Sequence, residues 1–166
     1  TAYSYDTNGN KIRETYADGG YKTFDYDRKN RLIKTESYEA GEAGESIGEK
    51  TLKTVYSYDI NDRLLESIDY QIDGAEETTV RYTEYQYDRR GQTTGYAELS
   101  QENEPTADEI KAHQIRYHYD SDGKLTKVTY PTTKNGVHAL SYEYDQNGWL
   151  TKIKGEIQSG DSGTEK

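Results

Sequence analysis

Aromatic and polar residues alternate along short stretches of the chain, and each stretch runs into a polar turn. Tyr142 and Tyr144 flank one polar residue, and Asp145 and Gly148 follow them before Leu150 opens a second alternating stretch. Alternation with a period of two places both rings on one face of a β-strand. The pattern therefore predicts a β-hairpin, two antiparallel strands joined by a tight turn.

The same unit occurs six times, which makes the chain a repeat array of roughly a dozen strands. The Tyr-Asp pairs lie at 5–6, 26–27, 58–59, 87–88, 119–120 and 144–145. Two residues before each of these tyrosines the chain is aromatic, at Tyr3, Phe24, Tyr56, Tyr85, Tyr117 and Tyr142. Six residues after the tyrosine, four units carry a leucine that we expect to start the return strand and face the core: Leu32, Leu64, Leu125 and Leu150. Lys11 and Thr93 take that position in the first and fourth units.

The residue types in each turn explain why the chain reverses there. An aspartate opens every turn, at Asp6, Asp27, Asp59, Asp88, Asp120 and Asp145. Its carboxylate can accept a hydrogen bond from the backbone N–H two residues later. Three residues after it stand Gly9, Asn30, Asp62, Gly91, Gly123 and Gly148, residue types that tolerate a left-handed backbone. This spacing predicts a type I turn followed by a bulged residue with positive φ.

The other ends of the units vary more. Tyrosines close the return strands at Tyr16, Tyr38, Tyr70, Tyr96 and Tyr130. Connections of different length follow, at 17–20, 39–50, 71–77, 100–112 and 131–136. We expect the repeated turns at one edge of the sheet and the variable loops at the other. Thr106 and Glu109 form a capping box, which predicts one helical turn in the fourth connection.

Composition alone would suggest disorder. Leu, Ile, Val and Phe together number 23 of 166 residues, about 14%, beside a net charge of -10. The chain also has 18 Tyr, and tyrosine buries a large area while keeping a polar tip. Because these tyrosines are patterned, we expect an ordered all-β chain.

Charge and residue types exclude several classes of function. The charge of -10 argues against nucleic acid or an anionic membrane as partner, since both need basic patches. Without Cys there is no disulfide framework, thiolate nucleophile or Cys-based metal site. No apolar run approaches the roughly 18 residues that would insert into a membrane. The chain has no Met either, so we expect a segment excised from a longer protein.

The unit aromatic-x-Tyr-Asp-x-x-Gly-x-Leu, repeated at intervals of 21 to 32 residues, resembles the YD repeat of the RHS family. The resemblance runs from Tyr3 to about Ile153 and is specific because six spaced copies carry it. It implies antiparallel hairpins in one continuous curved or spiralling sheet, a segment of the hollow shell found in bacterial RHS toxins, Tc-toxin cocoons and teneurins. It further implies a secreted or cell-surface bacterial parent whose shell encloses or presents another, C-terminal domain, in some members a toxin.

Two features limit what the resemblance implies. Six units are too few to close a shell. Toxin members also carry an autoproteolytic motif with an Asp-Pro step after the repeats, whereas Pro105 and Pro131 follow Glu104 and Tyr130 here. We therefore expect one non-catalytic array over residues 1–166, with other repeats of the parent chain as its partners.

Carboxylates are the first candidates for chemistry. Six equivalent aspartates at turns fit capping better than catalysis or metal binding. The stretches 120–123 and 145–148 resemble part of a calcium loop, which closes with Glu about twelve residues after its first ligand. Pro131 stands at that place in the first stretch, and the second reaches Glu156 but lacks the intervening acidic ligands. Turn capping is therefore favoured over a calcium site.

Other catalytic or cofactor motifs are missing from the sequence. His113, His118 and His138 have no HxxxH or HExxH spacing, so we expect surface histidines rather than zinc ligands. The sequence contains no GxSxG, P-loop or GxGxxG motif. We assign no catalytic, metal or cofactor-binding residue.

The tyrosine stripe leaves two interpretations open. The rings can pack across strands, at about 0.2–1 kcal/mol per favourable pair, or they can face solvent and stack on sugars. We favour packing, and a carbohydrate- or protein-binding module that uses aromatics and variable loops is the alternative. Trp149 stands where other units have Asn, Arg, Gln or Lys, so it is the candidate surface contact. Open sheet edges would also let copies of the chain pair with one another.

Overall fold

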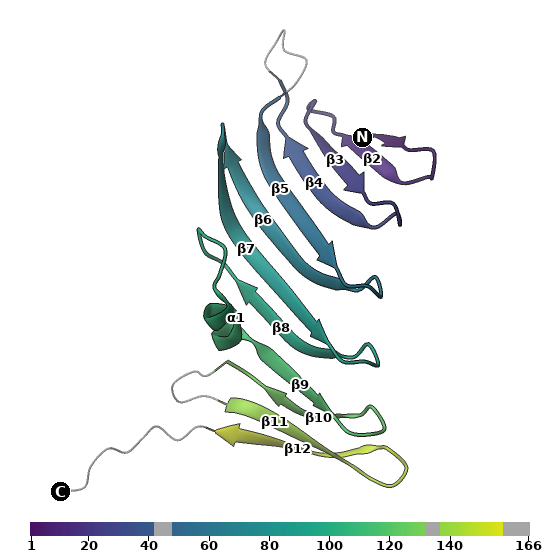
Figure 1. The fold of residues 1–166 in the computed structure, drawn as a ribbon, viewed down its shortest axis with the longest axis vertical. Helices are drawn as coiled ribbons and strands as arrows, with labels where there is room; N and C mark the ends of the chain where they lie inside the picture. Colours follow the sequence, from purple (N-terminus) through teal and green to yellow (C-terminus); the bar gives the residue numbers. More distant parts are fainter. Residues whose placement is uncertain (42–47, 132–136, 158–166) are drawn as a thin grey trace, which may run out of the picture. The chain divides into compact units, whose positions relative to one another are not determined.

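The computed structural model describes residues 1–41, 48–131 and 137–157, which form twelve β-strands and one short helix (Figure 1). The helix is α1 (Ala107–His113), between β8 and β9. The strands are β1 (Ala2–Tyr5), β2 (Lys11–Thr15), β3 (Tyr21–Tyr26), β4 (Leu32–Tyr38), β5 (Lys50–Tyr58), β6 (Leu64–Asp73), β7 (Glu76–Tyr87), β8 (Thr93–Leu99), β9 (Ile115–Tyr119), β10 (Leu125–Thr129), β11 (Val137–Tyr144) and β12 (Leu150–Ile157). They form one antiparallel sheet in chain order, which confirms the predicted all-β array of hairpins.

The chain divides into two compact units. The first comprises Thr1–Thr83 with Leu99–Pro105, and the second comprises Glu84–Glu98 with Thr106–Lys166. The first unit thus holds β1 to β6 and most of β7. The second holds the rest of β7, most of β8, α1 and β9 to β12. That residues 1–166 act as a single array stays a prediction.

Each repeat turn has the predicted backbone. The residue three positions after the aspartate has positive φ, between 60° at Asn30 and 87° at Gly91. Its N–H donates to the carbonyl of the aspartate, as in Gly9 to Asp6 at 3.1 Å. The sheet register shifts at the ends of these hairpins, for example between Asp25 and Tyr26. The bulged turn is therefore present in all six copies.

We call the face that carries the two aromatic side chains of each repeat the motif face. Strand register extends it across the first unit: Phe24 pairs with Thr35, and Thr35 pairs with Thr54, two residues before Tyr56. In the second unit Tyr117 pairs with Val128, which pairs with Leu140. Alternation sends the residues between these positions to the opposite face.

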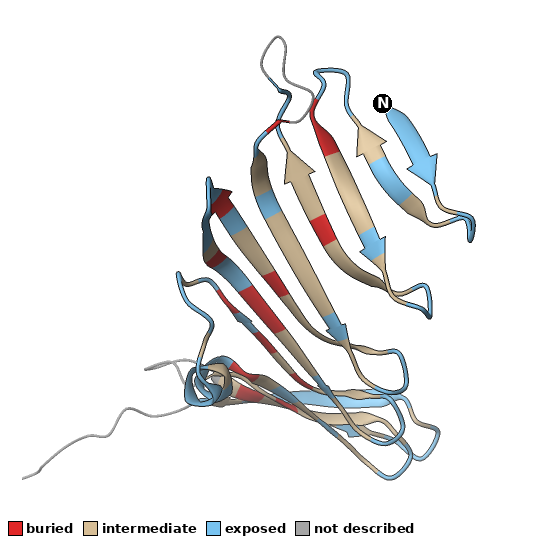
Figure 2. Cartoon of the chain, turned by 45° about the horizontal axis from the view of Figure 1, so that its top comes forward, coloured by how far each residue is buried: buried red, intermediate tan, exposed pale blue. Residues whose placement is uncertain are grey.

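Few side chains are buried, and the buried apolar side chains of the first unit favour the opposite face. The buried apolar residues of the described chain are Tyr21, Ile68, Ile72, Tyr82, Ala97, Leu99, Val128 and Ala139. Most strand residues are intermediate in exposure, as Figure 2 shows. The leucines expected to face the core are half-buried at Leu32, Leu64 and Leu125, and Leu150 is 49% exposed. A single sheet leaves both faces open to solvent unless another layer covers them, so that expectation was too strong.

Tyrosines and cations cover the opposite face of the first unit. The Tyr21 and Tyr38 rings stack with centroids 4.5 Å apart, and the Arg13 guanidinium lies 3.7 Å from the Tyr21 centroid. The Lys53 amino group lies 4.4 Å from the Tyr70 centroid. Cation–π contacts and ring stacking each add about 0.5–1.5 kcal/mol to burial. The return-strand tyrosines of this unit thus compensate for its low aliphatic content.

The helix α1 begins at the capping box that the sequence predicts. The Thr106 hydroxyl accepts from the Glu109 N–H at 3.3 Å, and the Glu109 carboxylate accepts from the Thr106 N–H at 2.7 Å. Two backbone donors that a helix start leaves free are satisfied in this way. The short helix is therefore fixed by its own sequence.

Replacing Gly148 with Val should lower the free energy of unfolding by about 1–3 kcal/mol, because Val strains a left-handed backbone. Gly148 has a φ of +84°, and an added Cβ would meet only the flexible end of Lys124, at 3.1 Å. Gly148→Asn is the matched control, since Asn30 holds the equivalent position at φ 60°. Denaturant unfolding of both variants measures the difference. Equal losses in the two variants would show that backbone strain is not the cause.

Candidate functional site

Each repeat turn is built around one aspartate carboxylate. In every copy the Oδ1 atom accepts from the backbone N–H groups two and four residues later. At Asp59 these donors are Asn61 and Arg63, both at 2.9 Å, and at Asp145 they are Asn147 and Trp149, also at 2.9 Å. The second donor, four residues on, was not foreseen from the sequence. With one oxygen already holding two backbone groups, the turn aspartates have a structural use in all six copies.

The second carboxylate oxygen has a side-chain partner in the first three turns. Asn10 Nδ2 donates to Asp6 Oδ2 at 2.9 Å, and Arg31 Nε donates to Asp27 Oδ2 at 2.7 Å. The Arg63 backbone N–H is the first cause that holds the pKa of Asp59 below its ordinary value, and the Arg63 guanidinium adds to it. These bonds favour the ionised carboxylate.

Neighbouring turns are also bonded to each other. The Asn30 carboxamide oxygen accepts from Asn8 and Asn10 of the preceding turn, at 3.2 and 2.9 Å. Where the turn has Gly123 instead, its carbonyl accepts from Gln92 Nε2 at 2.8 Å. The side chain at position 30 thus has a purpose despite its positive φ, because it receives the bonds from the turn before.

A second connection between repeats comes from the tyrosine of each Tyr-Asp pair, the motif tyrosine. Its hydroxyl donates to the backbone carbonyl of the return position, six residues after the motif tyrosine of the preceding repeat. The bonds run from Tyr26 to Lys11 at 3.0 Å, from Tyr58 to Leu32 at 2.7 Å, from Tyr119 to Thr93 at 2.9 Å and from Tyr144 to Leu125 at 2.9 Å. This bond was not foreseen from the sequence. Its signal is that the motif position is always Tyr, whereas the position two before it also admits Phe24.

The motif aromatics gain cover from neighbouring repeats. Tyr3 and Tyr5 in the first repeat are 53% and 59% exposed, whereas those of the other five repeats are half-buried. Burial raises the pKa of Tyr58 and of Tyr119, as expected for hydroxyls withdrawn from water. Rings also meet within the second unit, where the Tyr85 and Tyr96 centroids are 5.3 Å apart. The tyrosine stripe is thus packed, and hydrogen bonds from its hydroxyls connect one repeat to the next.

Trp149 differs from its equivalents in the other turns. Its backbone N–H completes the Asp145 turn, but its side chain is 72% exposed. Leu150, Ile153 and Ile157 on β12 are also exposed, by 49%, 55% and 70%. Exposed apolar side chains on an edge strand are a candidate contact surface. Its role as a contact stays a prediction.

The remaining candidates lie apart from one another. The described residues contain no group of three or more His, Asp or Glu side chains placed to hold a metal ion. His118 lies beside the Thr129 hydroxyl at 3.4 Å, and His138 lies 3.6 Å from the Glu156 carboxylate.

Within the described ranges, no helix is both long enough and apolar enough to cross a membrane.

Comparison with known families identifies part of the chain. Residues 119–156 match the model of the family described as RHS Repeat. This part of the chain resembles an RHS repeat. It holds the fifth and sixth Tyr-Asp pairs, and the four earlier pairs have the same aspartate turns. The resemblance predicted from the sequence is thereby confirmed.

Solved structures give looser likenesses. TcdB2-TccC3-TEV aligns over 94% of this chain at 19% identity, with a TM-score of 0.46. The Photorhabdus luminescens Tc holotoxin pore aligns with the same three values, and this chain spans 9% of the length of either protein. A Bacteroides fragilis protein of unknown function aligns over 84% of this chain and 94% of its own, at 13% identity and a TM-score of 0.41. No curated protein matches the sequence.

Replacing Tyr58 with Phe should lower the free energy of unfolding by about 0.5–1.5 kcal/mol, because the Leu32 carbonyl loses its donor. Tyr56→Phe is the matched control on the same strand, since the Tyr56 hydroxyl has no hydrogen bond to any described residue. Chemical denaturation of the two variants gives the comparison. If both variants unfold like the parent chain, the bond between repeats contributes nothing.

Acid should destabilise the fold as the turn aspartates become protonated. The pKa of Asp59 is lowered in the folded chain, first by the Arg63 backbone N–H. Stability from such a group is complete above its unfolded pKa, near 4, and is lost as pH falls through the folded value. Tm should therefore drop between neutral pH and about pH 3.

Asp59→Asn should reduce that drop, because the amide keeps an acceptor oxygen and does not titrate. Asp73→Asn serves as the control, since the Asp73 carboxylate has no hydrogen bond to a described residue. Thermal melts at the two pH values report the outcome. An equal drop in all three proteins would exclude Asp59 as a source of the acid sensitivity.

Proposed function

We propose that the chain is a non-catalytic structural segment of an RHS/YD-repeat protein, whose repeats build a β-shell or scaffold around or beside another domain. The observation that carries this proposal is the bond to the preceding repeat from four motif tyrosines, Tyr26, Tyr58, Tyr119 and Tyr144. Because this bond recurs with the repeat, such hairpins are attached in the same way to the hairpin before them. Such an array can be lengthened by adding units, which is what a scaffold requires.

The use of the polar groups supports the same proposal. The turn carboxylates hold backbone N–H groups, and Asp62 binds Lys29 and Arg31 of the turn before it, at 2.8 and 2.7 Å. Side chains committed to their own turns are poorly placed to bind substrate or move protons. We therefore propose a scaffold rather than an enzyme, with no cofactor.

The exposed edges supply the partners of this scaffold. The Leu150 carbonyl stands at the return position on β12, and Leu150 itself is 49% exposed although its equivalents are half-buried. A following repeat would bring a motif tyrosine to that carbonyl and cover Ile153. We propose that further repeats of the parent chain do so. In the isolated chain a second copy can offer Tyr5 instead, which would give head-to-tail self-association.

The nature of the parent is proposed from the resemblance to the family. We propose a secreted or cell-surface bacterial protein in which the array encloses or presents a C-terminal domain, as in RHS toxins. The net charge of -10 and the absence of Cys suit a soluble surface that needs no disulfide. Nucleic acid and membrane insertion are not part of this proposal.

Hydrogen exchange of β12 tests whether repeats continue beyond it. In chain 1–166 the outward amides of β12 should exchange fast, because an edge strand leaves half of its N–H groups unpaired. In the full-length parent the peptide Leu150–Ile157 should exchange more slowly. The β6 peptide Leu64–Asp73 is the internal control, because it already has a strand on each side.

Fast exchange of Leu150–Ile157 in both proteins would contradict continuation of the array. Trypsin digestion of the full-length protein addresses enclosure, because a domain inside a shell is cut only after the repeats are cut. Cleavage of that domain first, with the repeats intact, would show that it lies outside.

The alternative function, recognition of carbohydrate or protein through exposed aromatics and loops, is favoured by one observation. Trp149 is 72% exposed beside the exposed stripe of β12. Because it is the only tryptophan, a ligand that contacts it would change the intrinsic fluorescence of the chain. Binding without such a change would count against this surface.

A further inference from the structure

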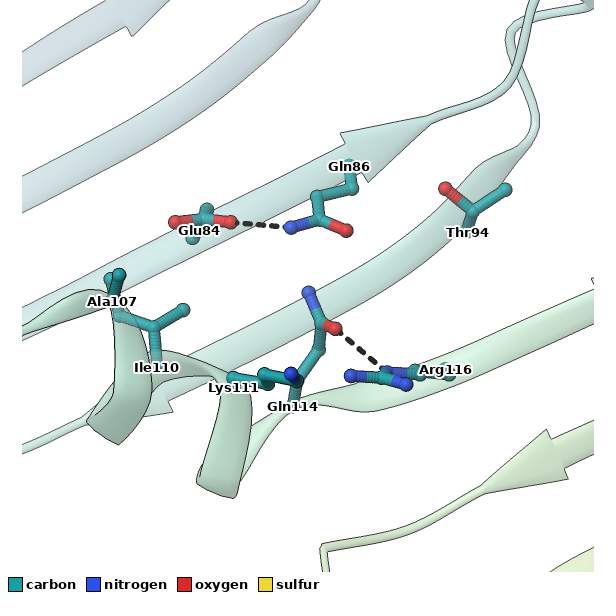
Figure 3. A pocket seen from close by; sticks show the side chains of 8 residues that line it. All are labelled: Glu84, Gln86, Thr94, Ala107, Ile110, Lys111, Gln114 and Arg116. Carbon is teal, nitrogen blue, oxygen red and sulfur yellow. Dashed lines mark hydrogen bonds between the residues drawn. The ribbon is translucent and has the colours of Figure 1, made fainter.

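An open cleft of about 410 Å³ lies between α1 and the strands of the second unit (Figure 3). Its lining includes Glu84 and Gln86 from β7, Ile110 and Lys111 from α1, and Gln114 and Arg116 beside them. Gln86 and Arg116 alternate with the motif aromatics of their strands, so the cleft is on the opposite face. None of these residues belongs to the repeat motif.

Gly95 lies against two of the side chains that line the cleft, Gln86 and Gln114. A Cβ at this position would lie 2.7 Å from Gln114 Nε2 and 2.9 Å from Gln86 Oε1. Real Cβ atoms do not approach other atoms so closely, so any larger residue would push the two amides away. Gly95 has no need of positive φ, and its use here is to leave room for these two side chains.

Both amides have one end bonded and one end free of partners in the described chain. Gln114 Oε1 accepts from Arg116 Nε at 3.0 Å, and Gln86 Nε2 donates to Glu84 Oε1 at 2.8 Å (Figure 3). Gln114 is only 8% exposed, yet its Nε2 has no acceptor among the described residues. Gln86 Oε1 likewise has no donor there. In an open cleft these two ends are available to a ligand or to water.

The free donor and the free acceptor lie close together. Both lie near the position that a Cβ would take at residue 95. They are therefore at most about 5.6 Å apart, the sum of the two distances above. One oxygen with two hydrogen bonds of about 2.8 Å can bridge a donor and an acceptor at any separation up to about that limit. A hydroxyl group both donates and accepts, so it can bridge Gln86 and Gln114 whichever way the amides are turned.

The surroundings favour an uncharged ligand. Glu84 carries a negative charge, whereas Lys111 and Arg116 carry positive charges, and both Glu84 and Arg116 are already bonded to glutamines. Ile110 adds an apolar side to the cleft. Planar polar side chains beside an apolar surface suit a sugar ring, which has hydroxyls around its edge and C–H groups on its faces.

An adjoining cavity of about 350 Å³ shares Lys111, Gln114 and Arg116 with the cleft and is also lined by Tyr130. This gives room for a second ring beside the first. We propose that the cleft beneath α1 binds a neutral oligosaccharide through Gln86 and Gln114. The site is separate from the scaffold role of the repeats, so either proposal can fail without the other.

Amide correlation spectra of chain 1–166 test the proposal. The probes are maltotriose, cellotriose and triacetylchitotriose, each added to about 20 mM, because binding to an open cleft is expected in the millimolar range. At least one probe should shift the side-chain amide signals of Gln86 and Gln114. Gln114→Ala and Gly95→Ala should each weaken that binding about tenfold, the loss expected from one or two hydrogen bonds.

Two further variants make the result decisive. Gln86→Ala changes an exposed side chain and keeps the test valid if a Gln114 variant fails to fold. Gln146→Ala removes an exposed turn glutamine outside the cleft and should bind like the parent chain. The proposal is overturned if no probe shifts the two amide signals. It is equally overturned if Gln86→Ala and Gly95→Ala leave the affinity unchanged while Trp149→Ala abolishes binding.

Discussion

The hydroxyl of the motif tyrosine sets the relation between one repeat and the next. A tyrosine ring that is half withdrawn from water must still satisfy its O–H group. The carbonyl at the preceding return position does this, although 15 residues separate Tyr26 from Lys11 and 26 separate Tyr58 from Leu32. The same bond spans different chain lengths, so the spacing of the hairpins does not depend on the connection between them.

This bond explains how the two ends of each hairpin can differ so much. At the turn end, aspartate carboxylates and the bonds between neighbouring turns repeat, as in Asn10 to Asn30. At the other end, the connections differ in length and sequence. Loop closure entropy rises only slowly with length, so an insertion costs little once the hairpins are held elsewhere. The array thus keeps one edge regular and leaves the other free to change.

What the sequence predicts well is local, and what it misses is the contact between distant residues. Alternation and turn chemistry sufficed for all six hairpins, and the capping box at Thr106 sufficed for α1. The acceptors of the tyrosine hydroxyls lie a whole repeat away, and no local pattern names them. The leucines were expected in a core, but a one-layer sheet has no interior to receive Leu32 fully. The face opposite the motif instead relies on contacts such as Tyr21 with Tyr38.

The cleft beneath α1 shows why function is hardest to predict in such an array. Gln86, Gly95 and Gln114 lie on different strands or connections, and none stands in a motif. They come together because β7, β8 and β9 are neighbours in the sheet while the long fourth connection folds its own helix beside them. A rigid repeated frame places the residues, and one inserted segment turns an ordinary face into a concave one. Candidate sites in proteins of this kind are therefore best sought where a variable connection folds back over the sheet, rather than in the repeated residues.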